Sequence, residues 1–345
     1  MSPEVEVVSQ ERRPEPPPRP ALAAPLRVVA FGGGTGLPRV LAGLLRLRPA
    51  GGGPTPGVGE EELTGGPPLA ITAVVAASDD GGSSGALRRA FGVPAPGDAR
   101  NCLVALAGPG SPLAGVFQHR FEGEAGLAGH PVGNLVLTAL AQRLGDFGAA
   151  VDAAAALLGA RGRVVPATHA PAALVGELAD GTEVAGESAL AGAGIPVSRV
   201  RLARAAAAPA AVLEALAEAD LVVLGPGSLY SSVLASALAD GVARALAETP
   251  ATRVLVVNLA CERGEAAGLS PAGHVRAVLR HLGDAVDVAL LDRSTVGPAE
   301  RAAVEALGVV PVTAELLPDA ADPAQAGLHD PAKLARALLR LARVR

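Results

Sequence analysis

The stretch that decides the fold is RVVAFGGGTGLPRVL, residues 27–41. Val28, Val29 and Phe31 form a short apolar run typical of a buried strand, and an amphipathic segment follows at once. Between them lie four glycines and a threonine in residues 32–36. Glycine permits positive φ and close approach of a ligand, and the amides at a helix start attract phosphate. The stretch therefore predicts a strand–loop–helix unit with an anion-binding loop, the alternative being a tight turn without a ligand.

The loop does not match the two common phosphate-binding motifs. No lysine follows the glycines, as a P-loop requires, and Lys333 is the single lysine of the chain. The dinucleotide motif also fails, because its glycine spacing would be broken by Leu37 and Arg39. The loop by itself indicates a phosphate or a nucleotide without specifying which.

Composition excludes several classes of protein. Half of the 345 residues are hydrophobic, which is ample for a large core. A net charge of −5, 2% aromatic residues and no tryptophan argue against a nucleic-acid-binding protein. Two cysteines, Cys102 and Cys261, cannot form a disulfide framework and favour a reducing compartment. The sequence shows no signal peptide and no uninterrupted membrane span, so we expect a cytoplasmic protein.

Hydrophobic patterning indicates an α/β protein. Residues 1–24 are predicted to be a disordered tail, and residues 25–345 a single α/β domain with a flexible Gly/Pro-rich insertion at 48–68. Almost continuously apolar strands are predicted at 26–31, 69–77, 221–224, 253–259 and 286–291. Helices are predicted at 37–47, 211–218, 232–246, 271–281 and 298–307. This alternation favours a doubly wound, mostly parallel sheet.

The middle of the chain, residues 98–200, has a different pattern. Residues 98–159 are predicted to be helical, and residues 174–187 to form a hairpin. The dipeptide Asp180-Gly181 suits a type I′ turn at the tip of that hairpin.

Three further strand ends carry polar clusters, where open α/β sheets bind ligands. ASDDGGSSG, residues 77–85, presents Asp79 and Asp80, which could accept hydrogen bonds from sugar hydroxyls or hold a hydrated divalent ion. Ser83 and Ser84 are expected to cap the next helix. The alternative interpretation is a turn followed by a cap.

The third cluster begins at Asp98, which is expected to cap a helix that starts near residue 99. Arg100 in the first turn opposes the helix dipole, which is understandable if it faces a phosphate or the acids of the second cluster. Asn101 lies beside it, and GHPVGN places His130 and Asn134 at another helix start. His130 is equally consistent with a structural role.

The fourth cluster is LGPGSLYSS, residues 224–232, with a strand that ends in glycines and a hydroxyl, Ser228, that starts a helix. This is a second potential anion site, which a diphosphate could share with the first. Tyr230 could contact a sugar or base, or belong to the core. Asn258 ends the next strand, with Glu262 and Glu265 nearby.

Six motifs in this order resemble the bacterial gluconeogenesis factor family (YvcK-like), a branch of the 2-phospho-L-lactate transferase superfamily. They are GGGTGL, ASDDGGSSGALRRAFGVPAPGDARNCLVALA, FQHRF, GHPVGNL, ADLVVLGPGSLYSSVL and NLACERGEAAGLS. The resemblance runs from about residue 26 to beyond residue 270. It implies a cytoplasmic, Rossmann-like three-layer α/β/α core with a helical and hairpin insertion. It also implies binding of UDP-sugars, notably UDP-N-acetylglucosamine, a role in cell shape and peptidoglycan synthesis during gluconeogenic growth, and no established reaction.

The residues and the resemblance together yield one set of candidate ligand-binding residues. They are Gly33, Gly34, Thr35, Gly36, Asp79, Asp80, Ser84, Asp98, Arg100, Asn101, His130, Asn134, Gly225, Gly227, Ser228, Tyr230 and Asn258. No catalytic residue and no resident metal ligand are assigned.

Two functions stay open on the sequence. The first is a regulatory protein that binds a nucleotide-sugar. The second is a phospholactate-type transferase that acts on a nucleotide-activated substrate, with Mg²⁺ held by Asp79 or Asp80. Nucleic acid is not expected as a partner, while a homo-oligomer and a regulatory protein partner are left open.

Overall fold

The computed structural model describes residues 24–47, 68–124, 126–259, 264–319 and 327–342. The predicted tail and the predicted insertion fall almost entirely outside these ranges, so both stay predictions. The strands are β1 (Leu26–Gly32), β2 (Leu69–Val75), β3 (Arg163–Pro166), β4 (Leu174–Leu178), β5 (Glu183–Ala185), β6 (Val197–Leu202), β7 (Leu221–Leu224), β8 (Thr252–Val256), β9 (Val288–Asp292) and β10 (Val310–Ala314).

Seven of the described strands form one sheet in the order β10-β9-β8-β7-β1-β2-β3. Every neighbouring pair in it is parallel. Successive residues of a strand enter opposite cores: Val29 and Phe31 pack into one buried cluster, Val28 and Ala30 into the other. A sheet that is buried on both faces explains the continuously apolar strands, and the predicted three-layer α/β/α fold is confirmed.

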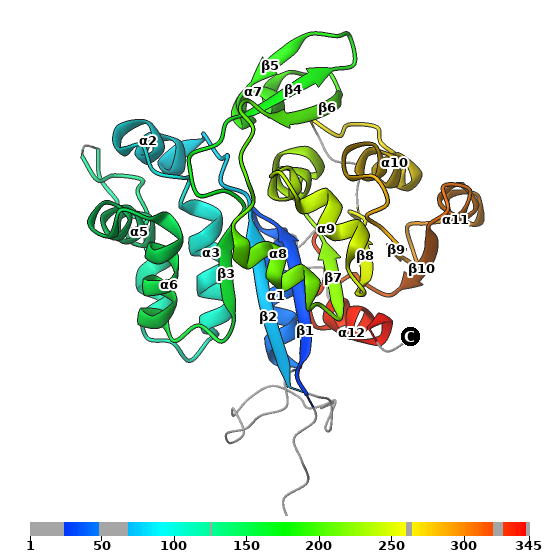
Figure 1. Cartoon of the computed structure of the whole chain (residues 1–345), viewed down its shortest axis with the longest axis horizontal. Coiled ribbons are helices and arrows are strands. Elements are labelled where there is room, and N and C mark those ends of the chain that lie inside the picture. The colour runs from blue at the N-terminus through cyan, green and yellow to red at the C-terminus, as the bar shows by residue number, and fades with distance from the viewer. Residues whose placement is uncertain (1–23, 48–67, 125, 260–263, 320–326, 343–345) are drawn as a thin grey trace, which may run out of the picture.

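The helices are α1 (Gly36–Arg46), α2 (Gly82–Phe91), α3 (Gly97–Ala107), α4 (Ala114–Gln118), α5 (Val132–Leu144), α6 (Phe147–Leu158), α7 (Glu187–Gly192), α8 (Ala210–Ala217), α9 (Val242–Glu248), α10 (Pro271–Leu282), α11 (Pro298–Glu305) and α12 (Pro331–Leu341). Helices α1, α3, α5, α6 and α12 bury their apolar side chains against one face of the sheet. Helices α8, α9, α10 and α11 cover the other face (Figure 1).

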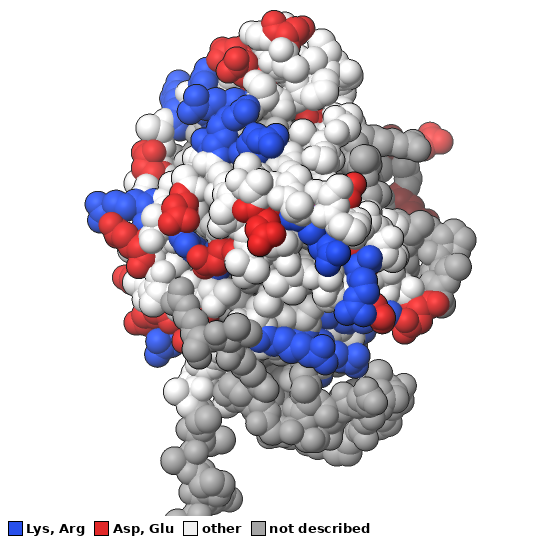
Figure 2. Space-filling model, turned by 90° about the vertical axis from the view of Figure 1, so that its right-hand side faces the viewer, with Lys and Arg blue, Asp and Glu red and all other residues white. Residues whose placement is uncertain are grey.

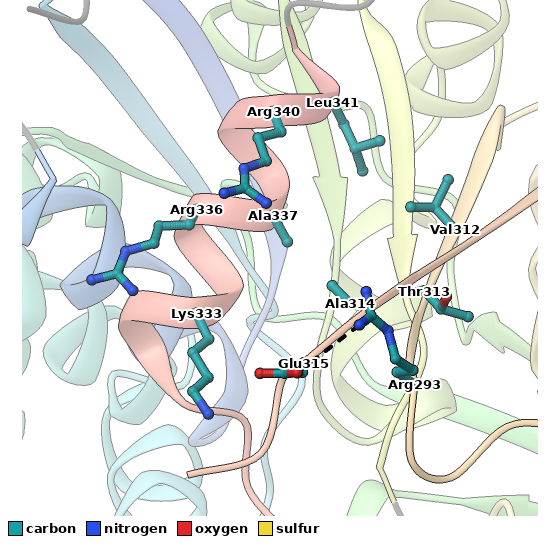
Figure 3. A pocket seen from close by; sticks show the side chains of 10 residues that line it. All are labelled: Arg293, Val312, Thr313, Ala314, Glu315, Lys333, Arg336, Ala337, Arg340 and Leu341. Carbon is teal, nitrogen blue, oxygen red and sulfur yellow. Dashed lines mark ion pairs between the residues drawn. The ribbon is translucent and has the colours of Figure 1, made fainter. Parts of the chain in front are cut away.

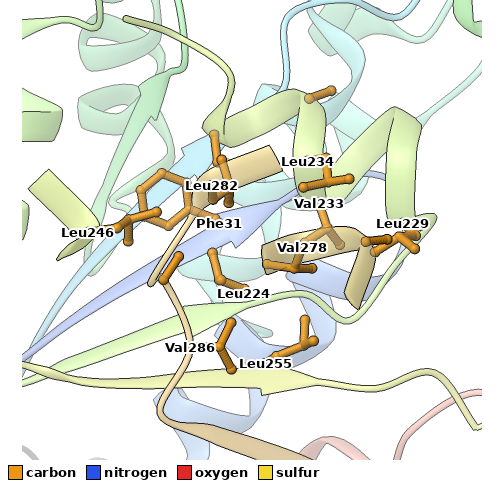
Figure 4. Close-up of a cluster of buried hydrophobic side chains, with 14 of the residues drawn as sticks. Phe31, Leu224, Leu229, Val233, Leu234, Leu246, Leu255, Val278, Leu282 and Val286 are labelled. Carbon is orange, nitrogen blue, oxygen red and sulfur yellow. The ribbon is translucent and has the colours of Figure 1, made fainter. Parts of the chain in front are cut away.

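Figure 4 shows the core beneath α8, α9, α10 and α11. Phe31, Leu224 and Leu255, on three neighbouring strands, pack there with Leu246 and Val278. Phe31 and Leu224 are fully buried. Full burial of such a side chain contributes roughly 1.5–3 kcal/mol, which anchors the two central strands whose ends carry the glycine loops.

The predicted helix 232–246 is wrong as one continuous helix. The chain instead forms a π-helical turn, η1 (Leu229–Leu234), then a 3₁₀ turn, η2 (Ala235–Ala237), and a separate helix α9. The break lies where Gly241 takes a φ of +93°, which a helix interior does not tolerate. Apolar periodicity alone did not reveal it, because both pieces bury residues in the same core.

A small antiparallel sheet, in the order β5-β4-β6, stands over the carboxyl ends of the parallel strands (Figure 1). The predicted hairpin is confirmed as β4 and β5, but its third strand, β6, was not predicted. The type I′ turn is wrong, because Gly181 has a φ of +85° while no described non-glycine residue has a positive φ. A type I′ turn requires positive φ at both central residues, and Asp180 does not supply it.

Candidate functional site

The site lies where the order of the parallel strands reverses. Strand β1 pairs with β2 on one side and with β7 on the other. The chain runs outward from β1 through β2 to β3, and returns to the opposite side of β1 at β7. Open α/β sheets bind ligands at such a switch point, outside the carboxyl ends of the strands. The loops that follow β1, β2 and β7 are three of the four clusters predicted from the sequence.

The two glycine loops touch each other through their backbones. A Cβ added to Gly36 would lie 2.0 Å from the carbonyl oxygen of Pro226, and one on Gly227 would lie 3.7 Å from the carbonyl oxygen of Gly33. Gly36 has no positive φ, so close packing rather than backbone conformation requires a glycine there. The loops after β1 and β7 therefore form one continuous surface.

Each glycine loop is fixed by a side chain from elsewhere in the chain. The backbone N–H of Gly34 donates to Asp98 Oδ1 over 2.8 Å. Asn258 Oδ1 accepts from the N–H of Gly227 over 3.2 Å, and its Nδ2 donates to the carbonyl oxygen of Gly227 over 2.8 Å. Asp98 does not cap its own helix as predicted, since α3 begins after Pro96 without a side-chain cap. Its position in the first turn lets it reach the β1 loop instead.

Arg100 organises a polar network among α2, α3 and α5. Its guanidinium is buried and donates to the Oδ1 atoms of Asn134 and Asn101, each over 2.7 Å. Asn134 Nδ2 donates to Ser83 Oγ over 3.1 Å, and that hydroxyl lies 2.8 Å from His130 Nδ1. Burial lowers the pKa of Arg100 to about 10, with the charge of Arg120 adding to the effect. The guanidinium stays charged at neutral pH.

The serines of the second cluster do not cap α2, contrary to the prediction. The cap position belongs to Gly81, which has no side chain to make a cap bond. Ser83 joins the Arg100 network, while Ser84 is buried with its Oγ 2.5 Å from where a Cβ of Gly97 would lie. Both serines therefore hold α2 against its neighbours.

The two aspartates after β2 have separate tasks. Asp79 Oδ1 accepts from the N–H of Gly81 over 2.9 Å, which fixes the turn. Asp80 Oδ1 accepts from the N–H of Ser188 over 2.9 Å and thereby ties the small sheet to the end of β2. Gly186 makes this approach feasible, because its φ is +100° and a Cβ there would lie 2.2 Å from Asp80 Oδ2.

Sequence reasoning missed Glu187, the first residue of α7. Burial, together with the charges of Asp79, Asp98, Glu265 and Asp80, raises the pKa of its carboxyl to about 9. Glu187 is therefore protonated at neutral pH and can donate a hydrogen bond. The sequence offered no signal for it. Glu187 belongs to α7, which lies far along the chain from the loops after β1 and β2, and only the fold brings its carboxyl to the site.

Glu265 is a second residue whose role the sequence did not show. Its side chain is buried, and Oε1 accepts from the N–H groups of Tyr230 and Ser231 over 2.9 and 3.0 Å. The Tyr230 ring is buried too and lies edge-on to His281, with 5.9 Å between the ring centroids. The tyrosine ring therefore belongs to the core, while its backbone helps to place the β7 loop.

The tips of the site face solvent. Thr35 and Ser228 are exposed, and Gly34, Gly227 and Asp79 are partly exposed. Burial raises the pKa of Asp98 to about 6, against the lowering effect of its bond from Gly34. Within the described residues, no three histidine, cysteine or carboxylate side chains are grouped so that they could hold a metal ion. The surface thus presents backbone, hydroxyl and carboxyl groups rather than a preformed metal centre.

Comparison with known proteins identifies the family. The profile of 2-phospho-L-lactate transferase CofD matches residues 28–326. The gluconeogenesis factor of Halalkalibacterium halodurans is 38% identical over 257 residues, which cover 74% of each chain. That of Bacillus subtilis is 35% identical over 258 residues, covering 74% of this chain and 75% of the other. A crystal structure of a UPF0052-family protein from Bacillus halodurans matches with a TM-score of 0.80 and 34% identity, over 92% of this chain and 99% of that one. The chain therefore belongs to the gluconeogenesis factor family, within the CofD superfamily.

Proposed function

We propose that this protein is a cytoplasmic regulatory protein that binds a UDP-sugar, UDP-N-acetylglucosamine in particular, and supports cell shape and wall synthesis during gluconeogenic growth. The observation that carries the proposal is the contact between the two glycine loops at the switch point of the sheet. Two such loops side by side suit a diphosphate better than a single phosphate. The names of the relatives support the metabolic part of the proposal.

The chemistry of the site fits a sugar nucleotide. The exposed hydroxyls of Thr35 and Ser228 stand at the tips of the two loops, where phosphate oxygens would accept from them. The amides of Gly34 and Gly227 are already bonded to side chains, so they contribute the shape of the loop rather than free donors. Arg100 supplies positive charge behind the loops.

The carboxyl groups would recognise the sugar hydroxyls. The carboxyl oxygens of Asp79 and Asp80 accept hydrogen bonds, whereas protonated Glu187 donates one. Protonation of Glu187 also removes one negative charge from a site that would otherwise repel a diphosphate. The raised pKa of Glu187 therefore supports an anionic ligand.

A transferase is the second candidate, and the CofD family match favours it. In that reaction Mg²⁺ would stabilise the charge on the transferred phosphoryl group. The described residues offer no group of three metal-binding side chains, but Mg²⁺ is commonly held by one or two carboxylates together with substrate phosphates, a share that Asp79 and Asp80 could supply. The transferase can therefore be tested by adding a nucleotide together with Mg²⁺, so that the substrate phosphates bring the hydrated ion to the site.

Thermal unfolding separates the two candidates. UDP-N-acetylglucosamine, GDP and NAD are each added with and without Mg²⁺. Stabilisation by the UDP-sugar without metal is expected, and saturation at about 100 times Kd adds roughly 2.7 kcal/mol. Stabilisation by GDP only with Mg²⁺ would favour the transferase, and no response to any compound would contradict both proposals.

A pair of variants tests where the ligand binds. Asp79→Asn should reduce the stabilisation by the UDP-sugar, because a carboxylate acceptor at the site is lost. Asp152→Asn makes the same chemical change on the exposed side of α6 and should leave it unchanged. Growth of a deletion strain on a gluconeogenic carbon source, complemented by each variant, tests the cellular role in the same way.

A further inference from the structure

A second concave surface lies between α12 and the edge strand β10, which forms one border of the parallel sheet. It has a volume of about 440 Å³. Four cationic side chains surround it, Arg293, Lys333, Arg336 and Arg340, and its floor includes the apolar side chains Val312, Ala337 and Leu341 (Figure 3). We refer to this surface as the basic groove. Its residues are not among those at the switch point, and the gluconeogenesis-factor motifs end before it.

The cations of the basic groove form a row. Lys333, Arg336 and Arg340 stand three and four residues apart on α12, so they share one side of the helix. At about 1.5 Å rise per residue the row is roughly 10 Å long. Figure 3 shows Arg293 across the groove from this row, with its ion pair to Glu315 dashed. Figure 2 shows basic side chains in a band low on the face that carries α11 and β10.

Two of the four cations have no acidic partner within the described part of the chain. Lys333 pairs with Asp319, and Arg293 lies 3.9 Å from Glu315. The side chains of Arg336 and Arg340 take part in no ion pair or hydrogen bond in the ranges that the structure describes. The helix dipole favours a cation such as Arg340 in the last turn, but it does not account for Arg336 one turn earlier. Two cations one helical turn apart, without an acidic partner in the described ranges of a protein of net charge −5, point to an external anionic partner.

We propose that the basic groove binds an extended acidic segment of a partner protein. Alternate residues of an extended strand are about 6.6 Å apart, which is close to the roughly 6 Å between Arg336 and Arg340 along the helix axis. Acidic side chains at alternate positions would meet these arginines, and the apolar side chains between them would face the floor of the groove. Arginine clusters are a recurrent device for recognising acidic motifs.

The lining favours a peptide over a nucleotide or a small phosphate. None of its side chains is aromatic, so a base has nothing to stack on. The groove does not include the first two residues of α12: its lining on this helix starts at Lys333, the third residue, and continues to the end of the helix, so the lining offers side chains rather than the first amides of α12. The lining combines a line of side-chain cations on α12 with aliphatic carbon, and its one carboxylate, Glu315, lies beside Arg293. This surface fits a chain of alternating acidic and apolar residues.

The test uses the whole protein and a fluorescein-labelled hexapeptide of alternating glutamate and valine. Fluorescence anisotropy at 50 mM NaCl should show saturable binding, which weakens at least tenfold at 500 mM NaCl because the contacts are ionic. The same peptide with glutamine for glutamate should bind at least tenfold more weakly. Tripolyphosphate is titrated in parallel as a compact polyanion.

Charge reversal locates the site. The double variant Arg336→Glu/Arg340→Glu should lose at least tenfold in affinity for the glutamate peptide. Arg143→Glu is the matched control, since Arg143 is also an exposed arginine in the last turn of a helix, α5, and carries no ion pair in the described ranges. Circular dichroism and thermal unfolding establish that the variants are folded.

Four results would overturn the proposal. The first is equal binding of the glutamate and glutamine peptides, and the second is unchanged binding by the double variant. The third is tight binding of tripolyphosphate with none of the peptide, which would assign the groove to a small polyphosphate. If wild-type protein sediments as a dimer that the double variant dissociates, a second copy of this chain is the occupant instead. Stabilisation by the UDP-sugar should be the same in the double variant, so this inference stands or falls independently of the proposed function.

Discussion

Replacing Gly36 with alanine tests whether the two glycine loops are in contact. A Cβ at this position would lie 2.0 Å from the carbonyl oxygen and 2.5 Å from the carbonyl carbon of Pro226. Real Cβ contacts to backbone atoms are essentially never shorter than 3.0 Å, so the β7 loop has to move by about an ångström. The affected atoms belong to the backbone, which cannot turn away as a flexible side chain can.

The magnitude follows from two opposing effects. Overpacking of this kind costs roughly 1–3 kcal/mol, while alanine in a helix gains about 0.5–1 kcal/mol over glycine. We therefore expect Gly36→Ala to lower the free energy of unfolding by about 1–2 kcal/mol. Chemical denaturation with urea measures this difference directly.

The same helix supplies a matched control. A Cβ on Gly43 would also lie 2.0 Å from a carbonyl oxygen, that of Pro331 in α12, far from the glycine loops. Gly43→Ala should therefore destabilise the protein about as much but keep its stabilisation by the UDP-sugar, which Gly36→Ala should lose. Gly115→Ala, with open space around it, should stabilise by about 0.4–1 kcal/mol.

The reasoning is refuted if Gly36→Ala proves as stable as the wild type or, like Gly115→Ala, more stable. That result would mean that the loops after β1 and β7 have room between them. If Gly36→Ala is destabilised but binds the UDP-sugar as Gly43→Ala does, the contact exists and the ligand lies elsewhere.

Three further predictions concern single side chains. The folded protein holds the pKa of Glu187 at about 9 instead of 4.5, so the stability it contributes is full below about pH 4.5 and is lost as the pH rises to about 9. Urea denaturation at pH 5, 7 and 9 measures this decline in the free energy of unfolding, and Glu187→Gln should remove most of it. The smaller decline that Asp98 causes below about pH 6 should stay. Arg253→Ala should cost about 1.5–3 kcal/mol, because it removes the two charged hydrogen bonds of a partly buried ion pair with Asp287. Arg244→Ala, in an exposed helical pair, should cost less than about 1 kcal/mol. Asn258→Ala should speed amide exchange in the β7 loop and weaken UDP-sugar binding, while Asn258→Asp, which retains an acceptor, should have a smaller effect; equal exchange in both would contradict this role.

Much of the fold could be predicted because its causes are local. An apolar run, a glycine loop and an amphipathic segment in residues 27–41 predict β1, its turn and α1 without reference to the rest of the chain. The edge strand β10 was missed, because its side chains are only partly buried and its apolar pattern is short. Helix 232–246 was predicted too long, because apolar periodicity does not register a break at a glycine.

The sequence by itself determined that glycines and polar residues follow successive parallel strands, and therefore that they meet at one edge of a sheet. Only the tertiary structure decided what each side chain does there. Asp98 looked like a helix cap, but it bonds to a loop 64 residues earlier in the chain. Glu187 looked like a hairpin residue, but burial and, after it, four carboxyl groups from other segments raise the pKa of its carboxyl. Strand formation depends on neighbours in sequence, whereas side-chain hydrogen bonding and protonation depend on neighbours in space. Those neighbours come together only when distant segments fold onto one edge of the sheet.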